Sequence, residues 1–125
     1  MRTYQQQIEN AAHNVFHTLG RGHDKLAYQS AFMFSLEQQG LPINDDKTYP
    51  IFYNKFEVTN FKPDFCIDEE VIVQVMNKEI LKEEEELKFI NHLTKLRLEI
   101  GYIINFGMKI QVRIKYRRDK VIPIH

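Results

Sequence analysis

In the first part of the chain, apolar residues recur every three or four positions, which is the spacing of an amphipathic helix. The pattern predicts one helix over residues 3–19, stopped by Gly20, and a second helix that follows Asp24 as its N-cap and ends at Gly40. The apolar face expected for the second helix consists of Leu26, Ala27, Ala31, Phe32, Phe34 and Leu36.

After Gly40 the spacing changes to the two-residue alternation of β-strands. Strands are predicted over residues 49–53, 56–67, 71–75, 100–106 and 110–116. Asn54-Lys55 is a plausible hairpin turn between the first two, and Asp68-Glu69-Glu70 turns the chain before the third. The third strand is apolar on both faces except at Gln74, which predicts a central place in a sheet.

A third helix is predicted over residues 81–97, with Leu87, Ile90 and Leu93 on its apolar face and acidic residues in its first turn. The resulting element order is ααβββαββ. It predicts an α/β sandwich around a mixed sheet, with an antiparallel meander first and a helical crossover later.

Length and composition are those of one globular domain over residues 1–125, with 43% hydrophobic and 27% charged residues. The single cysteine, Cys66, excludes an internal disulfide and is expected to be a buried thiol. No apolar run approaches the 18 or so residues of a membrane span. We therefore expect a soluble cytoplasmic protein.

Charge is balanced, with 17 basic and 17 acidic residues, whereas nucleic-acid-binding proteins usually carry a basic excess. The chain nevertheless has an acidic run at Glu83–Glu86 and a basic end. The basic residues are Arg113, Lys115, Arg117, Arg118 and Lys120. They could contact phosphates, or they could guard an exposed edge strand. Edge strands and a neutral surface also permit a homodimer.

One stretch, KPDFCIDEEVIVQVMNK (62–78), has the arrangement that metal-dependent phosphodiester hydrolysis uses. That chemistry needs carboxylates that converge on divalent cations. A β-hairpin can supply an acid at the end of one strand, and an acid and a lysine at positions i and i+2 of the next. Asp64 occupies the first position, while Gln74 and Met76 occupy the other two.

The chain resembles the GxxExxY group of the PD-(D/E)XK nuclease superfamily over about residues 5–117. The stretches that carry the resemblance are LGRGHDKLAYQSAFMFSLEQQG (19–40), YPIFYNKFEVTNFKPDFCIDEEVIVQVMNK (49–78) and FINHLTKLRLEIGYIINFG (89–107). The resemblance implies a restriction-endonuclease-like three-layer sandwich, in which helices flank a mixed sheet.

The resemblance also implies which positions would carry the chemistry. The family's name-giving glutamate falls on Lys25, its hairpin aspartate on Asp64, its strand glutamate on Gln74, its lysine on Met76, and the glutamine often found on the next helix on Lys88. The first four residues here carry no net charge, which makes a poor site for Mg²⁺ or Mn²⁺, since hard cations need several anionic oxygens. We expect the ammonium of Lys25 to lie beside Asp64 in place of a metal.

The expected function is therefore that of a catalytically degenerate nuclease-like domain that serves as a binding or structural module, with nucleic acid or protein as its partner and no cofactor. The alternative is an active DNA endonuclease or exonuclease that depends on a divalent metal, whose acids have moved to Asp24, Asp68 or Glu79. In the first case Asp64 and Gln74 are structural and Met76 fills the core; in the second Asp64 is a metal ligand, with Gln74 able to offer a neutral oxygen.

Overall fold

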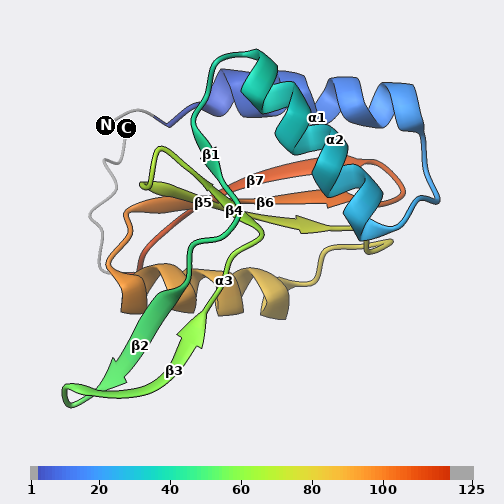
Figure 1. The fold of residues 1–125 in the computed structure, drawn as a ribbon. Coiled ribbons are helices and arrows are strands. Elements are labelled where there is room, and N and C mark those ends of the chain that lie inside the picture. The colour runs from blue at the N-terminus through green and yellow to red at the C-terminus, as the bar shows by residue number, and fades with distance from the viewer. Residues whose placement is uncertain (1–2, 119–125) are drawn as a thin grey trace, which may run out of the picture.

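The computed structural model describes residues 3–118, which form three layers (Figure 1). Helices α1 (Gln5–Leu19) and α2 (Lys25–Gln38) cover one face of a sheet, and α3 (Glu83–Leu96) covers the other. The strands are β1 (Ile43–Asn44), β2 (Tyr49–Tyr53), β3 (Phe56–Phe61), β4 (Phe65–Ile67), β5 (Val71–Met76), β6 (Ile100–Phe106) and β7 (Ile110–Tyr116). The predicted sandwich is confirmed.

The main sheet has the order β1-β4-β5-β6-β7, with β5 at its centre as predicted. Strand β5 runs antiparallel to β4 and parallel to β6, and α3 makes the crossover between the two parallel strands. Their carboxyl ends therefore lie at the same edge of the sheet, where Met76 is opposite Asn105. In α/β sheets this edge is where sites are usually built.

The single strand predicted over residues 56–67 is wrong, because the structure divides it into β3 and β4. Strand β3 pairs with β2 in a separate two-stranded sheet, whereas β4 joins the main sheet. Pro63 lies in the gap between the two strands and has no backbone N–H for a ladder hydrogen bond. The short strand β1 was not predicted.

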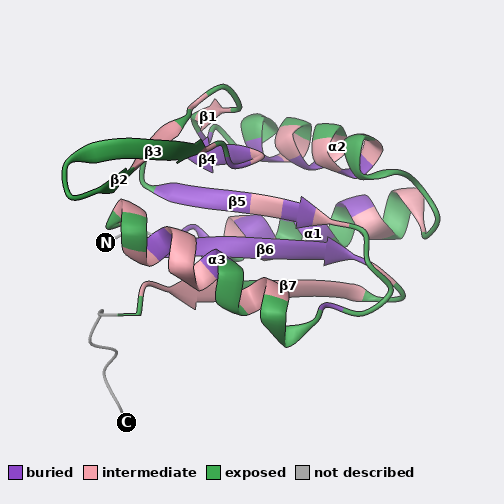
Figure 2. Ribbon diagram, turned by 90° about the horizontal axis from the view of Figure 1, so that it is seen from below, coloured by how far each residue is buried: buried purple, intermediate pink, exposed green. Residues whose placement is uncertain are grey.

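The core consists of two apolar clusters, one on each face of the sheet. Val71, Val73 and Val75 point toward α1 and α2, while Ile72 points toward α3, as the alternation of a strand requires. Strands β5 and β6 are buried along almost their whole length (Figure 2). Cys66 is buried on the α3 side, as expected.

The predicted apolar face of α2 is wrong in part. Leu26 and Phe34 are 69% and 62% exposed, while Tyr28, Phe32 and Leu36 are buried. Those three recur every fourth residue and so share one face, and a side chain two positions away points to the opposite side.

The predicted apolar face of α3 needs the same correction. Leu87 is 47% exposed, and the buried residues of this helix are Phe89 and Leu93.

Within residues 3–118, no helix has both the length and the apolar character needed to cross a bilayer.

Candidate functional site

Asp64 lies at the edge of the sheet where β4 begins, and both of its carboxylate oxygens have partners. Lys25, the first residue of α2, places Nζ 2.9 Å from Asp64 Oδ1. The backbone N–H of Val75 donates to Asp64 Oδ2 at 2.6 Å. The Asp64 side chain is only 14% exposed, against 45% for Lys25. The expected proximity of the ammonium to the carboxylate is therefore present.

Gln74 completes this arrangement from the opposite strand. The β4–β5 ladder includes the pair Phe65 and Val73, and one position further the strands separate. There the side-chain oxygen of Gln74 accepts a hydrogen bond from the backbone N–H of Asp64 at 2.8 Å. Where backbone pairing between β4 and β5 stops, the side chain of Gln74 thus accepts from a backbone N–H of the Asp64 segment, and the side chain of Asp64 accepts from a backbone N–H of β5.

The residues at this position do not fit a divalent metal. Asp64 is the only carboxylate among the motif positions, one of its oxygens lies against an ammonium, and the other accepts from a backbone N–H. Over residues 3–118, no three His, Cys, Asp or Glu side chains converge as metal ligands. Hard cations need several anionic oxygens, which this arrangement does not offer.

Met76 and Lys88 lie on the α3 side of the same edge, beside Gln74. These three residues help to line a cavity of about 380 Å³. Met76 is half-buried and packs against the apolar cluster under α3, as expected for core filling. Lys88 lies on an exposed turn of α3.

The far wall of that cavity is an aromatic stack between the end of β3 and α3. The rings of Phe61 and His92 are 4.0 Å apart between centroids and nearly parallel, at 11°. Burial lowers the pKa of His92 from its ordinary value of 6.5, and the charges of Lys88 and Lys95 lower it further. The imidazole is therefore neutral at neutral pH.

Within residues 3–118, the three acids that could have replaced the motif form no metal-ligand cluster with Asp64. Asp24 accepts a hydrogen bond from Ala27 N at 2.9 Å and is the N-cap of α2, as predicted. Asp68 lies four residues from Asp64, beyond the other end of β4, roughly 13 Å away along an extended chain. Its carboxylate accepts from the Tyr4 hydroxyl at 3.0 Å.

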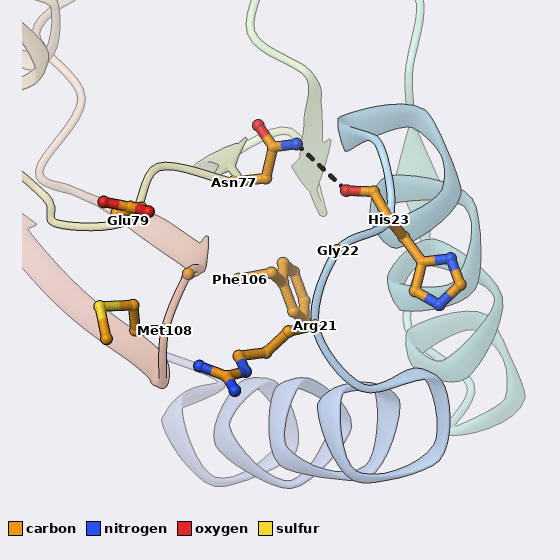
Figure 3. Close-up of a pocket in the computed structure, with 8 residues that line it drawn as sticks. Arg21, Gly22, His23, Asn77, Glu79, Phe106 and Met108 are labelled. Atoms are coloured by element: carbon orange, nitrogen blue, oxygen red, sulfur yellow. Dashed lines mark hydrogen bonds between the residues drawn. The ribbon is translucent and has the colours of Figure 1, made fainter.

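Glu79 lines a second cavity, also of about 380 Å³, between the α1–α2 loop, the β5–α3 loop and the β6–β7 turn (Figure 3). Phe106 is a buried part of the lining of this cavity, and the Arg21 side chain extends along its rim. Asn77 Nδ2 donates to the carbonyl oxygen of His23 at 3.2 Å, which ties two of the loops together. Glu79 is the one acid in the lining.

Several residues that carry the sequence resemblance have structural roles next to this cavity. The hydroxyl of Tyr28 donates to Gly20 O at 2.6 Å and accepts from His23 N at 3.3 Å. Its ring stacks on Phe106 with centroids 4.5 Å apart and planes at 2°. Gly20 has φ +73°, a value that side chains disfavour. Tyr28 thus fixes the α1–α2 loop against the end of β6.

Asn105 and Gly107 fix the β5–α3 loop to the same strand end. Asn105 is fully buried, accepts from Lys78 N at 2.9 Å, and donates to Lys78 O at 2.9 Å and to Gln111 Oε1 at 3.0 Å. A Cβ on Gly107 would lie 2.1 Å from Lys78 O, so only glycine allows this approach. We call Tyr28, Asn105, Phe106 and Gly107 the loop clamp.

The basic segment is largely occupied by partners within the chain. Lys115 Nζ lies 2.6 Å from Glu86 Oε1 on α3, and Arg113 Nε lies 4.0 Å from the same oxygen. Arg117 donates to the carbonyl oxygen of Arg97, and Arg118 donates to the Asn91 side chain. Lys120 lies outside the described residues. Sequence reasoning missed this pairing because it depends on how α3 lies against β7.

Comparison with known protein families finds a match. The model of a family described as the PD-(D/E)XK nuclease superfamily matches residues 2–118. No curated protein and no solved structure matches the chain. The match covers nearly the whole sequence, and the three-layer fold around a mixed sheet agrees with it. The chain therefore belongs to the PD-(D/E)XK nuclease superfamily.

Proposed function

We propose that this chain is a GxxExxY-type member of the superfamily that has lost nuclease activity and serves as a protein-binding module. The observation that carries the proposal is the state of Asp64. Both of its oxygens are engaged, by Lys25 at 2.9 Å and by the Val75 N–H at 2.6 Å. A carboxylate that is paired with an ammonium is a weaker ligand for a metal ion, because the cation would have to lie beside that ammonium or displace it.

The charge at the site supports the same proposal. Hydrolysis of a phosphodiester needs positive charge that can contact the phosphoryl oxygens and a group that activates water. Here the ammonium of Lys25 is neutralised by Asp64, and Met76 stands where the resemblance puts a lysine. The amide of Gln74 is no base, and its oxygen is already bonded to the backbone of Asp64.

A protein partner is favoured over nucleic acid by the surface charges. Glu86 pairs with Lys115 and Arg113, so the face formed by α3 and β7 presents less positive charge than its sequence suggests. Nucleic-acid affinity depends on basic groups that can displace counterions from phosphates. Exposed apolar side chains are available elsewhere on the molecule, on α2 and on the β2–β3 hairpin.

The test is a nuclease assay on plasmid and linear DNA with Mg²⁺ or Mn²⁺, comparing the protein with its Asp64→Ala variant. We expect no cleavage by either protein. Cleavage by the wild type that disappears in Asp64→Ala would overturn the proposal and favour the active enzyme. A salt-dependent gel shift without cleavage would agree with the proposed lack of nuclease activity, but it would show that the partner is nucleic acid and not a protein.

A restored variant tests the electrostatic reasoning itself. The triple variant Lys25→Glu, Gln74→Glu, Met76→Lys replaces a neutral site with one of net negative charge that suits a divalent cation. Calorimetric titration with Mn²⁺ should show binding by the triple variant and none by the wild type. The matched control is the triple variant with Asp64→Asn added, in which Mn²⁺ affinity should fall at least about tenfold. Equal Mn²⁺ binding by wild type and triple variant would refute the account of the site.

A further inference from the structure

The β2–β3 hairpin projects from the domain beyond α3 as a two-stranded arm (Figure 1). Its root is fixed, because Tyr49 and Phe61 pack against the apolar cluster under α3, and Phe61 stacks on His92 at 4.0 Å. Its turn has positive φ at Asn54 and Lys55, 49° and 69°, as tight hairpin turns require. The arm therefore leaves the body of the protein in a defined direction.

The outer half of the arm is exposed (Figure 2), and several of its exposed side chains are large and apolar. Tyr53 and Phe56 are opposite each other across the strands and are 68% and 70% exposed. Phe52, on the other face of the hairpin, is 58% exposed, and Val58 is 53% exposed. An isolated two-stranded hairpin is marginally stable in water. An aromatic tip on such a hairpin is typical of a contact surface.

The two edges of the arm differ in how well they can pair with another strand. Strand β2 contains Pro50, which has no N–H to offer. Strand β3 contains no proline and is exposed at every residue except the last, but the register shift opposite Ile51 and Phe52 leaves Val58 of β3 without a partner as a bulge. The β3 edge keeps an N–H at every residue and is the better of the two for a further strand, although Val58 interrupts it.

Charge decides between candidate partners for the arm. From Tyr49 to Phe61 the hairpin carries one cation, Lys55, and one anion, Glu57. An arm that entered a nucleic-acid groove would be expected to carry an excess of cations. A neutral arm on a chain of zero net charge meets no repulsion from a second copy of itself.

The exposed area of the arm is large enough to matter for a dimer. An aromatic side chain buries roughly 150–250 Å². At the exposed fractions of Tyr53 and Phe56, 68% and 70%, the two rings on one face together offer roughly 200–350 Å². A standard interface takes about 800 Å² from each partner. The two rings thus supply about a third of one, and the β3 edge adjoins them.

We propose that the β2–β3 arm binds the same arm of a second copy of this chain, so that the protein is a two-fold symmetric dimer. Such an interface uses one patch twice, which suits an arm whose charges balance and whose paired rings, Tyr53 and Phe56, lie on one face. The proposal deepens the protein-binding half of the proposed function and is independent of whether the chain cleaves DNA.

Light scattering after size exclusion, over about 1–200 μM protein, tests it. The wild type should have twice the 15.0 kDa mass of one chain. The variant Tyr53→Ser, Phe56→Ser should raise the dimer dissociation constant at least about 30-fold, the usual effect of removing central aromatic anchors. Phe34→Ser is the matched control, because it removes an aromatic residue that is 62% exposed on α2 and should leave the dimer intact.

Glu57→Lys separates a second copy from nucleic acid as the occupant of the arm. The change makes both arms of a dimer positive, so dimerisation should weaken, whereas binding to a DNA duplex would strengthen. A monomeric wild type at 200 μM would overturn the proposal, as would a dimer unaffected by the double serine variant. A monomer whose DNA gel shift requires Tyr53 and Phe56 would also overturn it and assign the arm to nucleic acid. The nuclease assay on the same proteins reports separately on inactivity.

Discussion

Removing the ammonium of Lys25 should destabilise the fold through Asp64. The variant Lys25→Met leaves a similar length of side chain but no charge, so the Asp64 carboxylate, 14% exposed, keeps only the Val75 N–H as a partner. Burying a carboxylate costs free energy because it loses contact with water, and the attraction to Lys25 offsets part of that cost. The fold should therefore become less stable.

The size of the effect follows from the distance and the exposure. Two unit charges at 2.9 Å attract by about 6 kcal/mol at an effective dielectric constant of 20, and by about 1.4 kcal/mol in water. The Lys25 side chain is 45% exposed, so solvent screening places the net value near the lower figure. We expect a loss of about 1–2 kcal/mol, which corresponds to a fall of about 3–8 °C in Tm.

Urea denaturation of a double-mutant cycle measures the interaction itself. The cycle combines Lys25→Met with Asp64→Asn, and the coupling between the two changes should be about 1 kcal/mol and should shrink in 1 M NaCl. Lys62→Met is the matched control, because its ammonium pairs with Asp46 at 3.2 Å on a 90% exposed carboxylate and should change stability by less than about 0.5 kcal/mol. A coupling of zero, or one equal in low and high salt, would refute the electrostatic role of Lys25.

Three further outcomes concern the loop clamp and α3. Gly107→Ala should cost about 2–4 kcal/mol by urea denaturation and more than Gly101→Ala, because the added methyl meets a backbone oxygen at 2.1 Å rather than a ring at 2.7 Å. Asn105→Leu removes three buried hydrogen bonds and should lower the free energy of unfolding by about 3 kcal/mol or more. Gln111→Ala removes one of these bonds and should lower it by about 1 kcal/mol. Equal losses in the two variants would argue against the role given to Asn105 in the loop clamp. Because the pKa of His92 is lowered in the folded protein, its imidazole takes up a proton more readily in the unfolded chain. The free energy of unfolding should therefore fall as pH drops below 6.5. Tm measured across pH 5–8 should depend less on pH in His92→Gln than in the wild type.

Much of the sheet could be predicted because its strands have unambiguous patterns. Residues 100–106 and 110–116 were assigned with the bounds that β6 and β7 have, since the first is a continuous buried run and the second alternates. The break at Pro63 was missed because residues 56–67 keep a strand-like composition on both sides of it. Only tertiary pairing decides that β3 leaves the main sheet.

The site could be predicted in its charges but not in its hydrogen bonds. The resemblance put Lys25 and Asp64 at motif positions of one site, and their opposite charges led to the expectation that they lie together; the structure has that contact. The hydrogen bonds that join Asp64 to Val75 and Gln74 depend on where β4 and β5 separate, which no local pattern specifies.

The loop clamp has a consequence for how this domain can change over time. The contacts described for Tyr28, Asn105, Phe106 and Gly107 are with backbone groups, with one another and with the side chain of Gln111, and none of them involves Asp64. Architecture and reactivity therefore depend on separate sets of side chains. Substitutions at the sheet edge would therefore leave the contacts of the loop clamp in place, even where they change the charge of the candidate site.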